Sequence, residues 1–114
     1  MTKHSAASVP RDVPIPSTPD TTVWCSDAIA DMLRALEIPF VLLNPGASFR
    51  GLHDSIVNHL GNEKPQMILV LHEEHAVAIA HGYTKVVGKP LAAILHSNVG
   101  LMHGSMAIFD AWVD

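Results

Sequence analysis

The stretch "LVLHEEHAVAIAHGYTKVVGKPLAAILHS", residues 69–97, decides the fold because it predicts a strand, a helix and a second strand in succession. It opens inside the continuous apolar run 67–71 and closes on a second such run, 91–95. Between the two runs, apolar residues recur at the spacing of one helix face: Ala76, Ile79, Ala80, Tyr83 and Val87. Gly88 and Pro90 predict the end of that helix. Two strands joined by a crossover helix form the unit of a parallel sheet.

The same alternation extends toward the N-terminus. From Thr22 the apolar residues follow a helical spacing: Cys25, Ile29, Met32, Leu33 and Leu36. "FVLL" at 40–43 predicts a first strand, and "NPGAS" at 44–48 predicts a turn whose last residue, Ser48, caps the next helix. That helix has its own apolar face and ends at Gly61: Leu52, Ile56, Val57 and Leu60. Residues 99–113 are apolar nearly all round, so we expect a last, buried helix there.

The element order, one helix and then three strand–helix pairs, predicts an α/β fold with a parallel sheet and helices on both faces. Uninterrupted apolar runs favour strands that are covered on both faces. We expect one domain at residues 21–114, preceded at residues 1–20 by a flexible leader because four prolines lie among polar residues there. A sheet of three strands leaves an apolar edge uncovered, so we expect this domain to be the truncated first part of something larger.

Composition excludes several classes of function. The net charge is −4, and seven Lys and Arg are scattered along the chain, which argues against a nucleic-acid partner. No apolar run approaches the roughly 18 residues of a membrane span. The single cysteine, Cys25, excludes an internal disulfide and a cysteine-based zinc cluster. Because the N-terminus lacks the apolar segment of a secretory signal, we expect a cytoplasmic protein; a mitochondrial transit peptide is the weaker alternative, since Asp12 and the prolines interrupt a basic amphipathic helix.

The unusual polar residues follow the three predicted strands, at 44–48, 72–75 and 96–100. In parallel α/β sheets, ligands bind at the carboxyl ends of the strands, so these three places predict the site. Glu73 and Glu74 also suit a purely structural role, because acidic side chains stabilise a helix N-terminus by about 0.3–1 kcal/mol each.

Other motifs are incomplete. His72 and His75 do not form the zinc-binding H-E-x-x-H pattern, because residue 76 is alanine, so we expect no metal ligands in this chain. "NPGAS" lacks the G-K-[ST] of a phosphate-binding loop. No G-x-S-x-G motif accompanies the histidine and serine that end the third strand, and a structural histidine remains the alternative there.

Taken together, these stretches resemble the N-terminal, pyrimidine-binding domain of thiamine-diphosphate-dependent enzymes, the family of acetolactate synthase, pyruvate decarboxylase and benzoylformate decarboxylase. The family pattern places a strand-end glutamate nine residues before a G-Y-[AT]-[RK] motif. In "HEEHAVAIAHGYTK", Glu73 stands nine residues before Gly82, whereas Glu74 falls where acetolactate synthases commonly have Gln. "NPG" at 44–46 is similar to the family's first strand-end turn.

The resemblance covers about residues 22–114 and favours one branch of the family. "LHSNVGLMHGSMAIFDAW", residues 95–112, is more similar to the "LHSAAG…AW" of benzoylformate decarboxylases than to the "TSGPG" of acetolactate synthases. The chain departs from benzoylformate decarboxylases at the Pro-Gly turn, where Ala47 replaces their substrate-binding serine and Ser48 follows one step later. It also lacks the adjacent histidine pair of pyruvate decarboxylases.

The resemblance implies roles for particular residues. Glu73 hydrogen-bonds N1′ of the cofactor's aminopyrimidine, and we expect a dry pocket that raises the pKa of this carboxyl. His96 faces a 2-oxo acid substrate as a second catalytic residue. The remaining candidates are Pro45, Gly46 and His103 on the cofactor side, and Ser48 and Ser97 on the substrate side.

The resemblance further implies partners that this chain lacks. Family enzymes hold the diphosphate and Mg²⁺ in a separate domain with a G-D-G…N motif, which does not occur among these residues. They are homodimers or homotetramers whose sites combine domains of two subunits, so this chain alone is expected to bind cofactor poorly. The alternatives are an acetolactate-synthase-like carboligase and, in another class, a non-catalytic fragment that acts only by pairing with a full-length relative.

Overall fold

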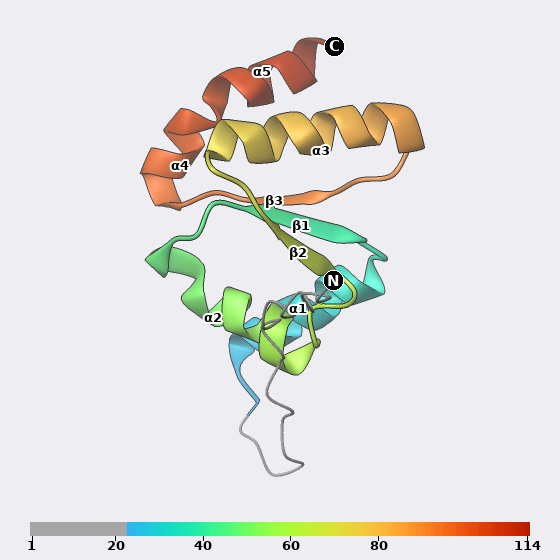
Figure 1. Cartoon of the computed structure of the whole chain (residues 1–114), viewed down its shortest axis with the longest axis vertical. Coiled ribbons are helices and arrows are strands. Elements are labelled where there is room, and N and C mark those ends of the chain that lie inside the picture. The colour runs from blue at the N-terminus through green and yellow to red at the C-terminus, as the bar shows by residue number, and fades with distance from the viewer. Residues whose placement is uncertain (1–22) are drawn as a thin grey trace, which may run out of the picture.

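The structure, a computed structural model, describes residues 23–114, and the leader expected at residues 1–20 lies outside them. Its centre is one parallel sheet of three strands, β1 (Phe40–Leu43), β2 (Gln66–Leu69) and β3 (Ala92–Ile94), in the order β2-β1-β3 (Figure 1). The predicted α/β class and the parallel sheet are therefore confirmed.

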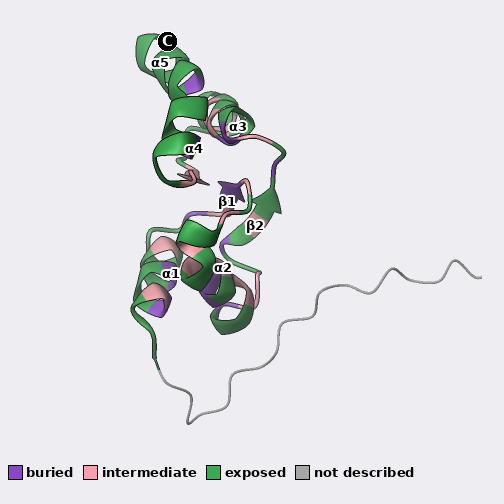
Figure 2. Ribbon diagram, turned by 90° about the vertical axis from the view of Figure 1, so that its left-hand side faces the viewer, coloured by how far each residue is buried: buried purple, intermediate pink, exposed green. Residues whose placement is uncertain are grey.

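Helices cover both faces of this sheet, as predicted (Figures 1 and 2). On one side lie α1 (Cys25–Ala35), α2 (Arg50–Asp54) and the π-helical turn η2 (Ser55–His59). On the other side lie three further helices: α3 (Glu73–Val87), α4 (Ser97–His103) and α5 (Ser105–Val113). The helix predicted after the first turn begins as a short 3₁₀ segment, η1 (Ala47–Phe49), before α2.

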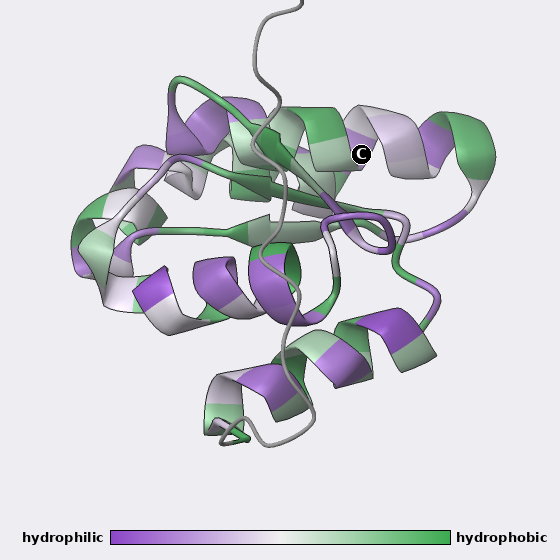
Figure 3. Ribbon diagram, turned by 60° about the horizontal axis from the view of Figure 1, so that its bottom comes forward, coloured by the Kyte–Doolittle hydropathy of each residue, from purple (hydrophilic) through white to green (hydrophobic). Residues whose placement is uncertain are grey.

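The core lies on both sides of the middle strand because successive side chains of a strand point to opposite faces. Val41 and Leu43 are fully buried against α1 and η2, in a cluster completed by Ala30, Ile56 and Leu60. Leu42 points the other way and packs with Val70 and Ala76 beneath α3. Figure 3 shows the strands as the hydrophobic layer between helices of mixed hydropathy. This arrangement fixes the carboxyl end of β1, from which the first polar loop leaves.

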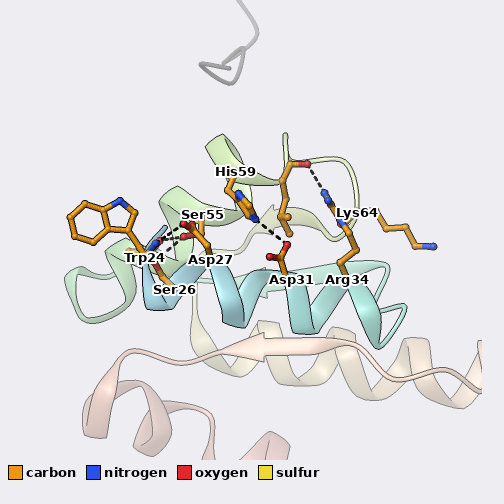
Figure 4. A network of polar contacts seen from close by, with 10 residues as sticks. Trp24, Ser26, Asp27, Asp31, Arg34, Ser55, His59 and Lys64 are labelled. Atoms are coloured by element: carbon orange, nitrogen blue, oxygen red, sulfur yellow. Dashed lines mark hydrogen bonds and ion pairs between the residues drawn. The ribbon is translucent and has the colours of Figure 1, made fainter. Parts of the chain in front are cut away.

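Polar contacts attach α1 to the segment that follows α2 (Figure 4). The side chain of Arg34 donates to the carbonyl oxygens of Lys64 and Leu60, each at 2.9 Å. Nε2 of His59 lies 3.0 Å from Oδ1 of Asp31. These contacts join α1 to η2 and to the residues that follow η2, on one face of the sheet.

The expectation that every strand is covered on both faces is wrong for β2. Ile68 and Leu69 are 38% and 59% exposed. The reason is topological, because β2 is an edge strand and the helices of both layers lie over the middle strand.

The expected buried helix at 99–113 is also wrong. The chain forms two helices there, separated at Gly104, and all of their large apolar side chains are exposed: Val99, Leu101, Met102, Met106, Ile108, Phe109, Trp112 and Val113. α5 packs along α3 and buries only Ala107, since one neighbouring helix covers one face. Within residues 23–114, no helix is long and apolar enough to cross a membrane.

Candidate functional site

The three polar loops predicted to form a site all leave the carboxyl edge of the sheet, because the strands are parallel. The chain passes from β1 to β2 through helices on one face, and from β2 to β3 through α3 on the other face. The loops after β1 and β3 therefore leave neighbouring strands at a switch in strand order, the place where ligands of open α/β sheets bind.

Glu73 is the buried acid of this edge. It is the first residue of α3, and only 4% of it is exposed, whereas Glu74 beside it is exposed. Its carboxylate lies within hydrogen-bonding reach of the side chains of Asn44, from the loop after β1, and of His103, from α4. The structure thus buries Glu73 and leaves Glu74 exposed. The nine-residue spacing to Gly82 selects the same acid, Glu73.

The expected rise in the pKa of Glu73 is wrong. The backbone N–H of Glu73 itself is the largest influence, and it lowers the pKa below the ordinary value of 4.5. Burial acts in the opposite direction, but Asn44 and His103 add further lowering. A dry pocket raises the pKa of a carboxyl only when it removes water without supplying donors, and this pocket supplies three.

Gly100 brings α4 against this carboxylate. It is buried, and a Cβ at this position would lie 3.0 Å from the backbone carbon of Leu95 and 3.1 Å from Cγ of Glu73. A side chain here would therefore push α4 away from the carboxyl group. Sequence reasoning missed Gly100 and Asn44 as site residues, although both lie within the loops that it singled out.

Two histidines stand beside Glu73. Nδ1 of His103 lies 3.5 Å from Oε2 of Glu73, and the rings of His103 and His72 stack with centroids 4.9 Å apart. One ligand atom from each of these three residues lies within 4.8 Å of the others, a grouping of the type that holds divalent metals. Nδ1 of His72 already accepts the backbone N–H of Glu74 at 3.2 Å, as the N-cap of α3. No sequence motif could have predicted this grouping, because His103 is distant from His72 and Glu73 in the sequence and reaches them only in the folded chain.

A second group forms around His96, at the end of β3. Oγ of Ser48 lies 2.6 Å from Nδ1 of His96. Phe49 meets the same ring edge-on, with centroids 6.2 Å apart, and Gly46 lies directly against it. The structure therefore brings together Gly46, Ser48 and His96, three residues predicted from two distant loops.

Two predicted residues lie at the edge of these groups. Ser97 is exposed and adopts a left-handed backbone conformation, with φ of 49°. Such strain in a residue other than glycine is common at functional sites. Pro45 borders an open cavity of about 410 Å³, which sequence reasoning did not anticipate; its lining residues are Pro45, Gly46, Ala47, Phe49, Arg50, His53 and Asp54.

Comparison with known proteins identifies the family. Residues 23–114 match the family described as "Thiamine pyrophosphate enzyme, N-terminal TPP binding domain". The match covers most of the chain, so the chain belongs to this family of thiamine-diphosphate-binding domains. The family that the sequence resembles is thereby confirmed.

Two curated relatives give the family context. The chain is 32% identical, over 89 residues, to the acetolactate synthase large subunit of Lactococcus lactis, covering 78% of this chain and 15% of that protein. It is 28% identical, over 104 residues, to the probable 2-ketoarginine decarboxylase AruI of Pseudomonas aeruginosa, covering 88% of this chain and 17% of that protein. The chain thus spans about one sixth of the length of these relatives. No solved structure matches it significantly.

The family implies thiamine diphosphate as cofactor, and the group around Glu73 fits its aminopyrimidine. A protonated pyrimidine ring nitrogen needs a hydrogen-bond acceptor. The buried carboxylate of Glu73 is such an acceptor, and the side chains of Asn44 and His103 contact this carboxylate and hold it in place.

Proposed function

We propose that this domain binds thiamine diphosphate through the aminopyrimidine ring, as part of a 2-oxo acid decarboxylase of the benzoylformate decarboxylase type. The observation that carries the proposal is the burial of Glu73 at the carboxyl edge of the sheet, within reach of Asn44. A carboxylate withdrawn from water and already held by donors is positioned to accept a hydrogen bond from the protonated nitrogen of a heteroaromatic ring.

Each residue of the site has a task in this proposal. In the free chain the lowered pKa keeps the carboxylate of Glu73 ionised. Glu73 and ring nitrogen N1′ both accept hydrogen bonds, so they would pair through one proton taken up from water on binding. Gly100 allows α4 to close over the carboxylate and exclude water. When bound, the cofactor supplies the electron sink that decarboxylation of a 2-oxo acid requires.

The substrate lies, in this proposal, on the side of Pro45, Gly46 and His96. His96 ends a strand beside the Pro-Gly turn, and its partly buried ring is held at a fixed position. Ser97 extends this edge toward solvent. The resemblance of the "LHS" stretch at 95–97 to benzoylformate decarboxylases supports a proposal of decarboxylation over carboligation.

One observation favours a second candidate, a carboligase of the acetolactate synthase type. The Lactococcus relative is named as an acetolactate synthase large subunit, and 78% of this chain aligns with it. Both candidates use the same aminopyrimidine contact. They differ in what reacts after decarboxylation, which depends on parts of the relatives that this chain does not span.

The partners follow from the same proposal. The whole enzyme is proposed to be a cytoplasmic homodimer or homotetramer that takes Mg²⁺ with the diphosphate on a separate domain. The grouping of His72, Glu73 and His103 is then a pyrimidine site, because Mg²⁺ prefers oxygen ligands and water to two imidazoles. The non-catalytic alternative, pairing with a longer relative, shares the buried glutamate but predicts no turnover in any assembly.

Titration of the ¹⁵N-labelled chain with thiamine diphosphate tests the proposal. We expect weak, saturable shifts of backbone amide signals confined to residues 44–48, 72–74 and 96–103. Glu73→Gln removes the carboxylate at unchanged shape, and its shifts should be lost. Glu74→Gln is the matched control, since Glu74 is exposed one residue away and should leave the binding unchanged.

Two outcomes contradict the proposal: shifts scattered over the surface, or equal binding by Glu73→Gln and the unsubstituted chain. Micromolar affinity of the chain alone contradicts a narrower part, the assignment of the diphosphate and Mg²⁺ to a separate domain. Calorimetry with thiamine diphosphate and MgCl₂ measures that affinity.

A further inference from the structure

The imidazole of His96 is held on three sides by residues of the loop after β1. Ser48 contacts Nδ1 at 2.6 Å, and Phe49 packs edge-on against the ring. Gly46 contacts the ring directly, because a Cβ at Gly46 would lie 2.8 Å from both Cγ and Nδ1 of His96. The loop that follows β1 therefore holds the side chain of His96, which follows the neighbouring strand β3.

Gly46 is needed here for space rather than for backbone freedom. Its φ is −154°, an extended conformation that any residue adopts. The three atoms that a Cβ at Gly46 would approach most closely all belong to the side chain of His96. The glycine of the Pro-Gly turn thus allows the ring of His96 to approach the backbone, where the hydroxyl of Ser48 reaches Nδ1.

The contact between Ser48 Oγ and His96 Nδ1, at 2.6 Å, is a short hydrogen bond. A hydroxyl can donate to Nδ1 or accept from it, so the bond couples the Ser48 hydroxyl to the tautomer of the ring. When the hydroxyl donates, a neutral ring accepts at Nδ1 and carries its hydrogen on Nε2.

We propose that Ser48 is a positioning residue, which fixes the tautomer and the orientation of His96 so that Nε2–H is presented as a hydrogen-bond donor. The ligand group that suits such a donor is an anionic oxygen, a carboxylate or a developing alkoxide. Its assignment to a 2-oxo acid rests on the proposed function. Ser48 then acts through His96. The family resemblance places Ser48 on the substrate side, but in this proposal its hydroxyl contacts His96 and not the substrate.

The test is imidazole ¹⁵N NMR of the full chain, without cofactor or substrate, at a pH where the ring is neutral. Two-bond ¹H–¹⁵N spectra distinguish a protonated from an unprotonated ring nitrogen, and His96→Gln assigns the signals. We expect His96 to show an unprotonated Nδ1, a protonated Nε2 and a single χ1 rotamer. In Ser48→Ala, the two nitrogen shifts should converge toward a tautomer average and the χ1 couplings toward a rotamer average.

Two variants separate positioning from a general structural effect. Ser48→Thr retains the hydroxyl and should keep the single tautomer. Ser105→Ala is the matched control, because it removes a serine hydroxyl that bonds to Met102 in another part of the site edge. The proposal is overturned if His96 carries its hydrogen on Nδ1, or if Ser48→Ala leaves both shifts and couplings unchanged. Because no thiamine is present, either result leaves the proposed function to its own test.

Discussion

Burial of Glu73 removes its carboxylate from water without raising its pKa, because hydrogen-bond donors take the place of the water. The backbone N–H at the start of α3 contributes most, and the side chains of Asn44 and His103 add to it. These donors come from three elements, so the ionised state of Glu73 is linked to the folded state. Loss of the charge is therefore expected to cost stability.

The sign of this linkage predicts how stability depends on pH. Because the pKa of Glu73 in the folded chain is below its ordinary value of 4.5, its contribution is fully present above that pH and is lost as the pH falls through the folded value. Urea unfolding at a series of acidic pH values should show a shallower decline of unfolding free energy in Glu73→Gln. Part of this pH dependence should remain in Glu73→Gln, because the pKa values of Asp27 and Asp114 are also lowered.

Glu74→Gln is the control for this measurement, since that carboxylate is exposed at the next position. It should reproduce the acid dependence of the unsubstituted chain. Equal slopes for Glu73→Gln and Glu74→Gln would show that the burial of Glu73 has no energetic link to its charge.

At the scale of the element, α1 ends in a capping motif that usually contains glycine. The N–H of Ile38 bonds the carbonyl of Leu33, and the N–H of Glu37 bonds the carbonyl of Arg34, which is the Schellman pattern. Glu37 is the residue in the left-handed conformation, with φ of 56°. The helix therefore ends cleanly at the cost of strain in one residue that has a Cβ.

Glu37→Gly is expected to stabilise the chain by about 0.5–1 kcal/mol. Relief of the left-handed strain gains about 1–2 kcal/mol, and the greater freedom of glycine in the unfolded chain offsets about 0.5–1 kcal/mol of it. Urea unfolding at neutral pH measures the difference. Glu37→Ala removes the same charge but keeps a Cβ, so it should show no such gain; a destabilised Glu37→Gly would refute the motif.

At the scale of the whole molecule, stability depends on a thin sheet whose middle strand contributes side chains to both cores. Val41 and Leu43 pack toward α1 and η2, and Leu42 alone of the three packs toward α3. The α3 side has the smaller buried cluster, while α4 and α5 expose much apolar surface. The side that positions Glu73 is thus the side with the fewest buried contacts.

Leu42→Ala should therefore destabilise the chain by about 2–5 kcal/mol, a large share of the roughly 5–15 kcal/mol typical of a domain. The substitution creates a cavity beneath α3, where Leu42 is completely buried. Leu71→Ala removes the same side chain at a position that is 91% exposed, and it should change stability by less than about 0.5 kcal/mol. Urea midpoints compare the two variants, and similar midpoints would refute the role of this core.

Much of the fold could be predicted from sequence because helix and strand periodicity are local properties. The runs at 40–43, 67–71 and 91–95 correspond to the three observed strands, with ends that agree within one or two residues. The single helix expected at 99–113 could not be resolved into two, nor its exposure foreseen, because an apolar sequence does not reveal how many neighbours a helix has. The neighbour present is α3, and it covers one face.

The sequence by itself determined the α/β class, the order of elements and the place of the polar residues at the carboxyl ends of the strands. It also distinguished Glu73 from Glu74, through the spacing to Gly82. Only the tertiary structure decided that His103 reaches Glu73, that Ser48 holds His96, and that the pKa of Glu73 falls. The physical reason is that the conformation of a segment follows from neighbouring residues, whereas hydrogen bonds and ionisation depend on partners that folding brings from distant parts of the chain.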